Sequence, residues 1–308
     1  MAHDSVWPHA GYGVFAVPPL PRINRRRTFD FDAATRIVEH IQAGGITRFL
    51  YGGNAFLYHV TQDEYECLVG WLAQFPATCL AIPSVGPSFG RAMDQARVIR
   101  RFGFNAVMLL PCNDPRDALG LEAGIREIAH ATGLPLILYL KSEDAFGNDT
   151  QTGLDAIGRL VTDGVAVAIK YAVVRTDPAR DPYLDGLLTR VEPGRVLSGI
   201  GERPAIAHLR GFGLGGMTTG SGCIAPRMCA AFFSACASGQ WTQADSLRSL
   251  FMPLEDLRDA WGPARVLHHA TELSGVAPTG PIPPFLSALT AEQLERLGPV
   301  ARQLVEAG

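Results

Sequence analysis

The sequence has little lysine and no basic tract. Only two of its 27 basic residues are lysines, Lys141 and Lys170, although lysine is normally among the commonest residues. The net charge of −3 and the lack of a basic block argue against binding to nucleic acid or an anionic membrane surface. No apolar run approaches the ~18 residues that cross a bilayer, and the start, MAHDSVWPHAGYG, lacks the features of a signal peptide. We therefore expect a cytoplasmic globular protein without a membrane or nucleic-acid partner.

Motifs for metals, nucleotides and disulfides are also missing. The six cysteines form no C-x-x-C pair, and the eight histidines form no H-x-x-x-H pair. There is no G-x-x-x-x-G-K-[ST] phosphate loop, and the stretch GFGLGG (211–216) lacks the G-x-G-x-x-G spacing of dinucleotide-binding folds. The sequence thus predicts no metal, no cofactor and cysteines that remain reduced.

What the sequence does contain is a regular alternation of short apolar stretches and segments of helical period. Eight stretches are expected as strands: 13–17, 46–51, 78–84, 105–111, 134–140, 165–170, 195–199 and 214–219. Apolar strands that alternate with helices are typical of a parallel sheet covered by helices, and eight such units favour a closed (β/α)8 TIM barrel. A doubly wound sheet is the alternative, although its dinucleotide fingerprint is missing.

Signals for helix starts agree with this interpretation. Asp30 can cap a helix over 30–45, and Thr61 with Glu64 three residues later forms the pattern of a capping box. Residues 1–225 are expected to form the barrel core. Residues 226–308 are helical in period and are expected to add the last barrel helix and a small C-terminal helical segment, as part of one structural unit.

Lys170 ends the apolar strand VAVAIK, where burial of an ammonium is costly. Tyr139 ends the preceding strand, and functional groups of (β/α)8 barrels sit at such strand ends. Neighbouring parallel strands lie about 4.8 Å apart, so the two side chains meet if both point into the barrel. A desolvated lysine loses its proton and attacks ketones to form a Schiff base, and a tyrosine can move protons. The alternative is an edge-strand lysine that extends its charge into solvent.

These stretches resemble the dihydrodipicolinate synthase / N-acetylneuraminate lyase family of Schiff-base (class I) aldolases, over roughly residues 10–290. LPLILYL (134–140) resembles the strand that ends in the catalytic tyrosine, and VAVAIK (165–170) the strand that ends in the imine-forming lysine. YGGNAFLYHVTQDEY (51–65) resembles the loop that binds the 2-oxo carboxylate. The resemblance implies a TIM barrel without cofactor, a homotetramer, and sites at Lys170, Tyr139, Gly52, Gly53 and Asn54.

Departures from the family pattern bear on the substrate. The two loop threonines of the family are Gly53 and Asn54 here, and its second relay tyrosine is replaced by Cys112 or Asn113, so parts of the family's proton relay are missing. Asp144 stands near the position at which the synthase carries an arginine for its second carboxylate substrate. An acid at this position is expected to repel that substrate, which argues against a true dihydrodipicolinate synthase.

The remaining polar residues expected at the barrel mouth suit hydroxyl groups. They are Asn113, Asp144, Glu202 and Thr218. We therefore predict a Schiff-base lyase whose partner is a small 2-oxo acid, and which cleaves or dehydrates a 2-oxo-3-deoxy sugar acid. One alternative is a barrel that binds a 2-oxo acid without turning it over, because relay residues are missing. A metal-dependent aldolase is another.

Overall fold

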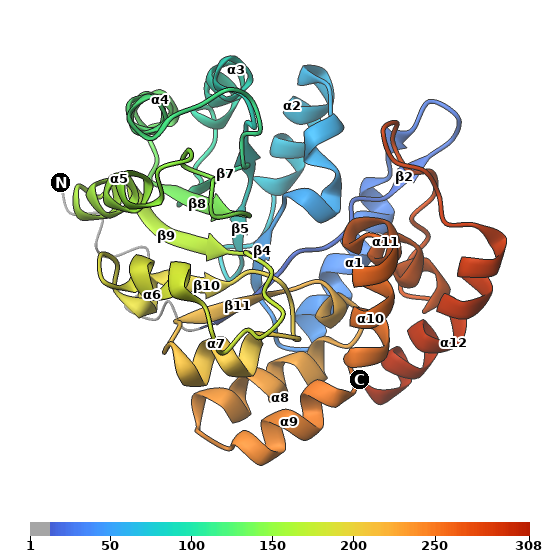
Figure 1. Cartoon of the computed structure of the whole chain (residues 1–308). Coiled ribbons are helices and arrows are strands. Elements are labelled where there is room, and N and C mark those ends of the chain that lie inside the picture. The colour runs from blue at the N-terminus through green and yellow to red at the C-terminus, as the bar shows by residue number, and fades with distance from the viewer. Residues whose placement is uncertain (1–12) are drawn as a thin grey trace.

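The computed structural model describes residues 13–308, so the expectation about a signal peptide concerns a segment that lies almost wholly outside the described residues. A sheet of parallel strands forms the wall of a barrel, in the order β5-β4-β1-β11-β10-β9-β8-β7-β6 (Figure 1). The strands are β1 (Gly13–Ala16), β4 (Arg48–Leu50), β5 (Leu80–Ile82), β6 (Ser84–Val85), β7 (Val107–Leu109), β8 (Leu136–Leu140), β9 (Ala166–Tyr171), β10 (Val196–Ser198) and β11 (Gly216–Thr219).

The barrel closes through a single bent segment. β5 and β6 lie at the two ends of the strand order, yet only Pro83 separates them in the chain. The stretch 78–84 was expected as one strand, and it is split because a proline has no N–H to donate to the ladder. The Pro83 carbonyl still accepts from the Met108 N–H at 2.9 Å. With β5 and β6 counted as one position, the eight expected strands and the (β/α)8 barrel are confirmed.

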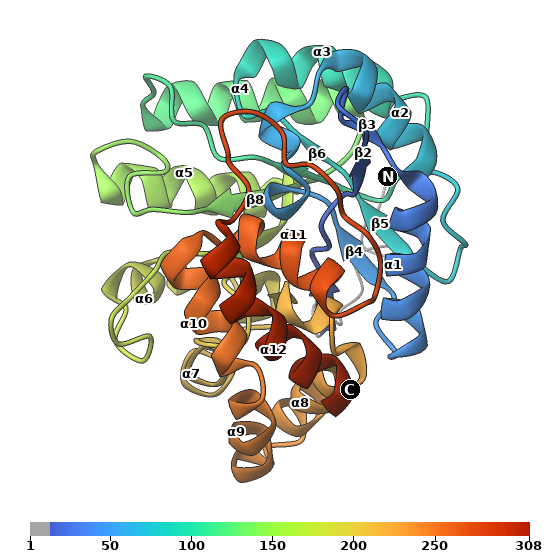
Figure 2. The same ribbon diagram turned by 90° about the vertical axis from the view of Figure 1, so that its right-hand side faces the viewer.

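Eight helices surround the barrel and alternate with its strands (Figure 2). They are α1 (Phe31–Ala43), α2 (Gln62–Leu72), α3 (Phe89–Ile99), α4 (Ala118–Thr132), α5 (Thr150–Thr162), α6 (Pro182–Leu188), α7 (Ala205–Gly211) and α8 (Pro226–Ala237). Both predicted helix starts are confirmed. The Asp30 side chain accepts from the Ala33 N–H, and Thr61 and Glu64 form a reciprocal capping box. Within residues 13–308, no helix is long and apolar enough to cross a membrane.

Four further helices follow the barrel: α9 (Trp241–Ser249), α10 (Met252–Trp261), α11 (Pro263–Leu273) and α12 (Ala291–Ala307). α11 packs against the short 3-10 helix η2 (Gly53–Ala55), which directly follows β4. The rings of Phe56 and His268 lie 5.5 Å apart at this contact. Figure 2 shows α10, α11 and α12 in front of the barrel, so these helices lie over the end at which the strands terminate. A hairpin of β2 (Arg22–Ile23) and β3 (Thr28–Phe29) lies beside them.

Strand register decides which side chains enter the barrel. Tyr139 is the register partner of Lys170, and Lys170 is the partner of Leu197 on β10, so these three side chains share one face of the sheet. Tyr171 points the opposite way, because its hydroxyl donates to Asp181 beside α6 at 2.6 Å. Lys170 and Tyr139 therefore face the barrel interior.

Candidate active site

Lys170 and Tyr139 meet at the carboxyl ends of β9 and β8. The Lys170 Nζ lies 4.2 Å from the centre of the Tyr139 ring, and Lys170 is only 5% exposed. Gly199, just after β10, allows this packing: a Cβ at this position would lie 2.9 Å from the Lys170 Cγ and 2.6 Å from the Tyr171 carbonyl oxygen. The two side chains that the sequence singled out are thus in contact inside the barrel.

Burial changes the proton affinity of both groups. Desolvation lowers the pKa of Lys170 to about 7, and the positive charges of Lys141 and Arg258 act in the same direction. Desolvation raises the pKa of Tyr139 to about 12. At neutral pH, about half of the lysine is therefore a neutral amine, while the tyrosine keeps its proton and can donate it.

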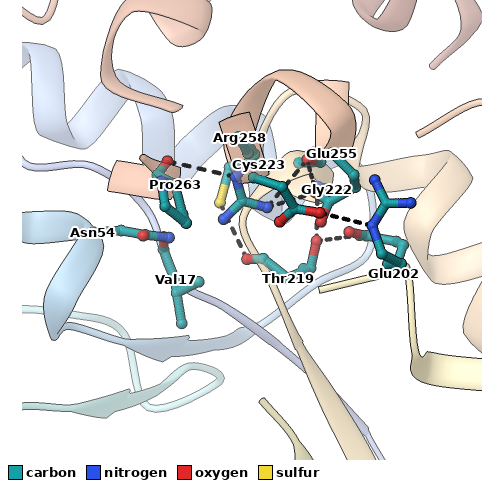
Figure 3. A network of polar contacts seen from close by, with 12 residues as sticks. Val17, Asn54, Glu202, Thr219, Gly222, Cys223, Glu255, Arg258 and Pro263 are labelled. Atoms are coloured by element: carbon teal, nitrogen blue, oxygen red, sulfur yellow. Dashed lines mark hydrogen bonds and ion pairs between the residues drawn. The ribbon is translucent and has the colours of Figure 1, made fainter. Parts of the chain in front are cut away.

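The loop after β4 begins at the same end of the barrel as Lys170 and Tyr139, because all the strands of the wall run parallel. A Cβ on Gly52 would lie 2.6 Å from the Met108 Cε inside the barrel, so a larger residue there would displace the end of the Met108 side chain. Within residues 13–308, the N–H groups of Gly53 and Asn54 have no hydrogen-bond partner. The Asn54 side chain donates to the Val17 carbonyl at 2.9 Å and fixes the loop to the end of β1 (Figure 3). Two adjacent free N–H groups are suited to a carboxylate.

A second tyrosine lies at this loop. Tyr58 belongs to the 3-10 helix η3 (Leu57–His59), and its ring edge would be 3.6 Å from a Cβ on Gly53. Desolvation, followed by the charge of Tyr139, raises the pKa of Tyr58, so both phenols are protonated at neutral pH. Tyr58 was not expected at the site, because the sequence alone does not show that η3 brings its ring next to Gly53.

Glu202 is not at the rim where it was expected. It is 0% exposed, and its Oε1 accepts from the Thr219 hydroxyl (Figure 3). The same oxygen accepts from the Cys229 thiol at 3.5 Å. Thr219 lies on the outer face of β11 and Cys229 on α8, so this carboxylate lies behind the barrel wall. Its Oε2 has no hydrogen-bond partner among the described residues. Desolvation and the neighbouring Glu255 raise the pKa of Glu202 to about 7, so it is partly protonated at neutral pH.

Helix α10 contributes an ion pair to the same network. The Arg258 Nη1 lies 2.5 Å from the Glu255 Oε1 (Figure 3). The same Glu255 oxygen also accepts from the Ser221 hydroxyl. Both charged groups are buried. Sequence alone gives no signal for Arg258, because it lies 88 positions after Lys170 on a helix outside the barrel.

The other predicted site residues lie at different depths. Thr218 is buried on the inner face of β11 as the register partner of Phe15. Asn113 is exposed in the loop after β7. Asp144 is exposed after β8, where its Oδ2 lies 3.5 Å from the Arg116 Nη2. A hydrogen bond from Ser142, and then the charge of Arg116, lower the pKa of Asp144.

An apolar cavity of about 370 Å³ lies beside the site rather than over it. Phe89 on α3 and Ile125 on α4 line it, together with Leu138 and Tyr139 of β8. Lys170 does not line this cavity. This cavity therefore does not reach the Lys170 amine. Across residues 13–308, no three His, Cys, Asp or Glu side chains group as metal ligands.

Comparisons with known proteins bear on the family and the fold of the chain. The model of the Dihydrodipicolinate synthetase family matches residues 13–303. A probable 5-dehydro-4-deoxyglucarate dehydratase of Rhizobium meliloti (strain 1021) is 26% identical over 311 residues, covering 96% of this chain and 97% of the relative. A second protein of that description, from Streptomyces coelicolor, is 27% identical and covers 88% of this chain and 86% of its own length. The crystal structure of dihydrodipicolinate synthase from Oceanobacillus iheyensis superposes with a TM-score of 0.84, at 20% identity over 98% of each chain.

Proposed function

Because the chain belongs to the dihydrodipicolinate synthetase family and is a lyase, we propose that it binds a 2-oxo-3-deoxy sugar acid as a Schiff base on Lys170 and dehydrates it. The contact of a buried, partly neutral Lys170 amine with the Tyr139 phenol at the strand ends carries this proposal. The names of the two bacterial relatives favour dehydration over aldol cleavage. They also make 5-dehydro-4-deoxyglucarate the first substrate to test, since it is a 2-oxo-3-deoxy acid when numbered from its keto end.

The neutral Lys170 amine attacks the ketone carbon, and Tyr139 donates a proton to the departing oxygen, so that water leaves and an iminium forms. The positive nitrogen acidifies the adjacent CH₂ group, and loss of one of its protons gives an enamine. The enamine expels the next hydroxyl as water once that hydroxyl is protonated. Hydrolysis of the conjugated iminium then frees Lys170, and the net change is loss of one water from the substrate.

The remaining groups of the site take supporting roles in this proposal. The free N–H groups of Gly53 and Asn54, held by Gly52, bind the carboxylate next to the ketone. Tyr58 lies near Tyr139 and takes the place of the missing relay tyrosine. Thr218 on the inner face, with Asn113 and Asp144 at the rim, faces the hydroxyl groups of the substrate. Glu202 lies behind the barrel wall, where its carboxyl group is buried and partly protonated at neutral pH.

We also propose a homotetramer in the cytoplasm. The family resemblance implies the tetramer, and closed symmetric assemblies are the default for soluble oligomers. Free thiols at all six cysteines agree with a reducing compartment. Light scattering at micromolar concentration tests the assembly, and a monomer would contradict it.

Trapping with borohydride tests the Schiff base. Pyruvate plus borohydride should add the mass of a reduced adduct to the peptide that contains Lys170. Lys170→Met should abolish the adduct. A label on Lys141 alone, or no label with any of several 2-oxo acids, would show that Lys170 is not the imine-forming residue.

Turnover separates an enzyme from a binding protein. Incubation with 5-dehydro-4-deoxyglucarate should release water, detected as a loss in product mass, and should not release pyruvate. Pyruvate release would identify an aldolase instead of a dehydratase. Trapping without turnover of any sugar acid would favour the binding protein.

A further inference from the structure

We propose that Lys141 binds a second carboxylate at the far end of the substrate, and that it selects 2-oxo acids with two carboxylates over those that end in a hydroxymethyl group. This inference rests on the proposed function and concerns the same site. It assigns a role to the one lysine that the Schiff-base chemistry leaves unused.

The position of Lys141 follows from the alternation along β8. Tyr139 faces the barrel interior, and Leu140 is the register partner of the outward-pointing Tyr171. Lys141 is the next residue, directly after the end of the strand, and the alternation continued by one residue would put it on the face of Tyr139. Lys141 is exposed. Its positive charge lowers the pKa of Lys170 more than the positive charge of Arg258 does. The ammonium of Lys141 therefore lies at the barrel mouth, within electrostatic range of the Lys170 amine.

Lys141 is also unpaired. In the part of the chain that the structure describes, it makes no ion pair and no side-chain hydrogen bond. The nearby acids have other partners, since Asp144 pairs with Arg116, and Glu143 pairs with Arg175. Arg116 thus partly offsets the charge of Asp144, so Asp144 opposes a second carboxylate less than an unpaired acid would.

The chemistry of the two ends of the substrate then differs. The loop at Gly53 and Asn54 offers neutral N–H groups to the carboxylate beside the ketone. Lys141 offers three donors and a full positive charge, which suit an anion better than a hydroxyl group. A dicarboxylic sugar acid fits both ends. The glucarate derivative in the names of the relatives carries two carboxylates.

Two 2-oxo acids of equal length test this selection without requiring turnover. 2-Oxoadipate ends in a carboxylate, and 6-hydroxy-2-oxohexanoate ends in a hydroxymethyl group. The concentration of each that gives half-maximal borohydride trapping on Lys170 is measured for the full-length protein and its variants. Any change in the pKa of Lys170 affects both acids equally, so the ratio of the two concentrations reports the far end alone.

Lys141→Ala should weaken trapping of 2-oxoadipate about 10- to 100-fold relative to 6-hydroxy-2-oxohexanoate, as expected for the loss of a hydrogen bond between charged groups. Lys141→Arg should keep most of the preference for 2-oxoadipate. Added salt should reduce that preference, because it screens the attraction between the cation and the carboxylate. Arg97→Ala, which removes an 83% exposed cation in the last turn of α3, should leave the ratio unchanged.

Equal losses for both acids in Lys141→Ala would overturn the inference, as would an arginine variant that behaves like alanine. In either case trapping on Lys170 would still support the proposed function. Failure of both acids and of pyruvate to label Lys170 in the wild-type protein would instead refute the proposed function, and this inference with it.

Discussion

Replacing Lys170 by methionine should stabilise the folded protein, because burial of the amine lowers the free energy of unfolding. Imine formation needs the buried amine, but the fold does not. Methionine keeps the length of the side chain and adds no charge or polar atom to the interior. The free energy of unfolding should rise even as imine formation is lost. Such a trade between stability and activity is common where a site holds a strained or desolvated group.

The magnitude follows from the two pKa values of Lys170. In the folded protein the pKa is about 7, against 10.5 for an ordinary lysine. Between these values the unfolded chain binds a proton that the folded chain does not, so wild-type stability rises with pH across that window. At pH 7 the penalty is about 4 kcal/mol, at about 1.4 kcal/mol per pKa unit. Lys170→Met should gain up to this amount, and the gain should shrink towards zero near pH 10.

Urea unfolding of both proteins at pH 6.5, 8 and 9.5, at one protein concentration, measures this difference. Arg97→Met, at an exposed position, is the matched control and should change the free energy of unfolding little at any of these pH values. A Lys170→Met variant that is less stable than wild type, or whose advantage does not depend on pH, would show that Lys170 is not held as a desolvated amine.

Three further substitutions test the surroundings of Lys170. Tyr139→Phe should lower turnover by about 10²–10⁴-fold with the fold intact, as for general acid–base groups; unchanged kinetics would assign the proton to another donor. Tyr58→Phe should also lower turnover, by about tenfold or more, if it replaces the missing relay tyrosine, and normal rates would exclude that role. Gly199→Ala should destabilise the protein by about 1–3 kcal/mol and reduce trapping, because its methyl would lie 2.6 Å from a backbone oxygen of β9. Gly194→Ala, whose Cβ would meet no atom within 4 Å, is the control, and equal losses in both variants would contradict the steric argument.

Local patterns determined much of this protein. The alternation of apolar strands and amphipathic helices predicts the barrel, because strand and helix periods are properties of neighbouring residues. The N-cap at Asp30 and the capping box at Thr61 are local for the same reason. A lysine at the end of an apolar strand can also be recognised from sequence as a candidate functional residue, since burial of its charge destabilises the fold.

Only the tertiary structure decided which groups share the site. The sequence places Tyr139 and Lys170 at strand ends, but the register of β8 against β9 brings them into contact. Glu202 was expected at the rim and is buried, because Thr219 and Cys229, from distant parts of the chain, surround its carboxylate. Such contacts join residues far apart in sequence.

The pairing of charges at the barrel mouth also could not be predicted from the sequence. From the sequence, Asp144 is an acid near the substrate, yet its charge is partly offset by Arg116, which lies 28 positions earlier in the chain. Lys141, two positions after Tyr139, keeps its charge unpaired among the described residues. The sequence shows which charged residues a site contains. Their net effect depends on which of them form ion pairs, and the packing of helices and strands decides those pairs.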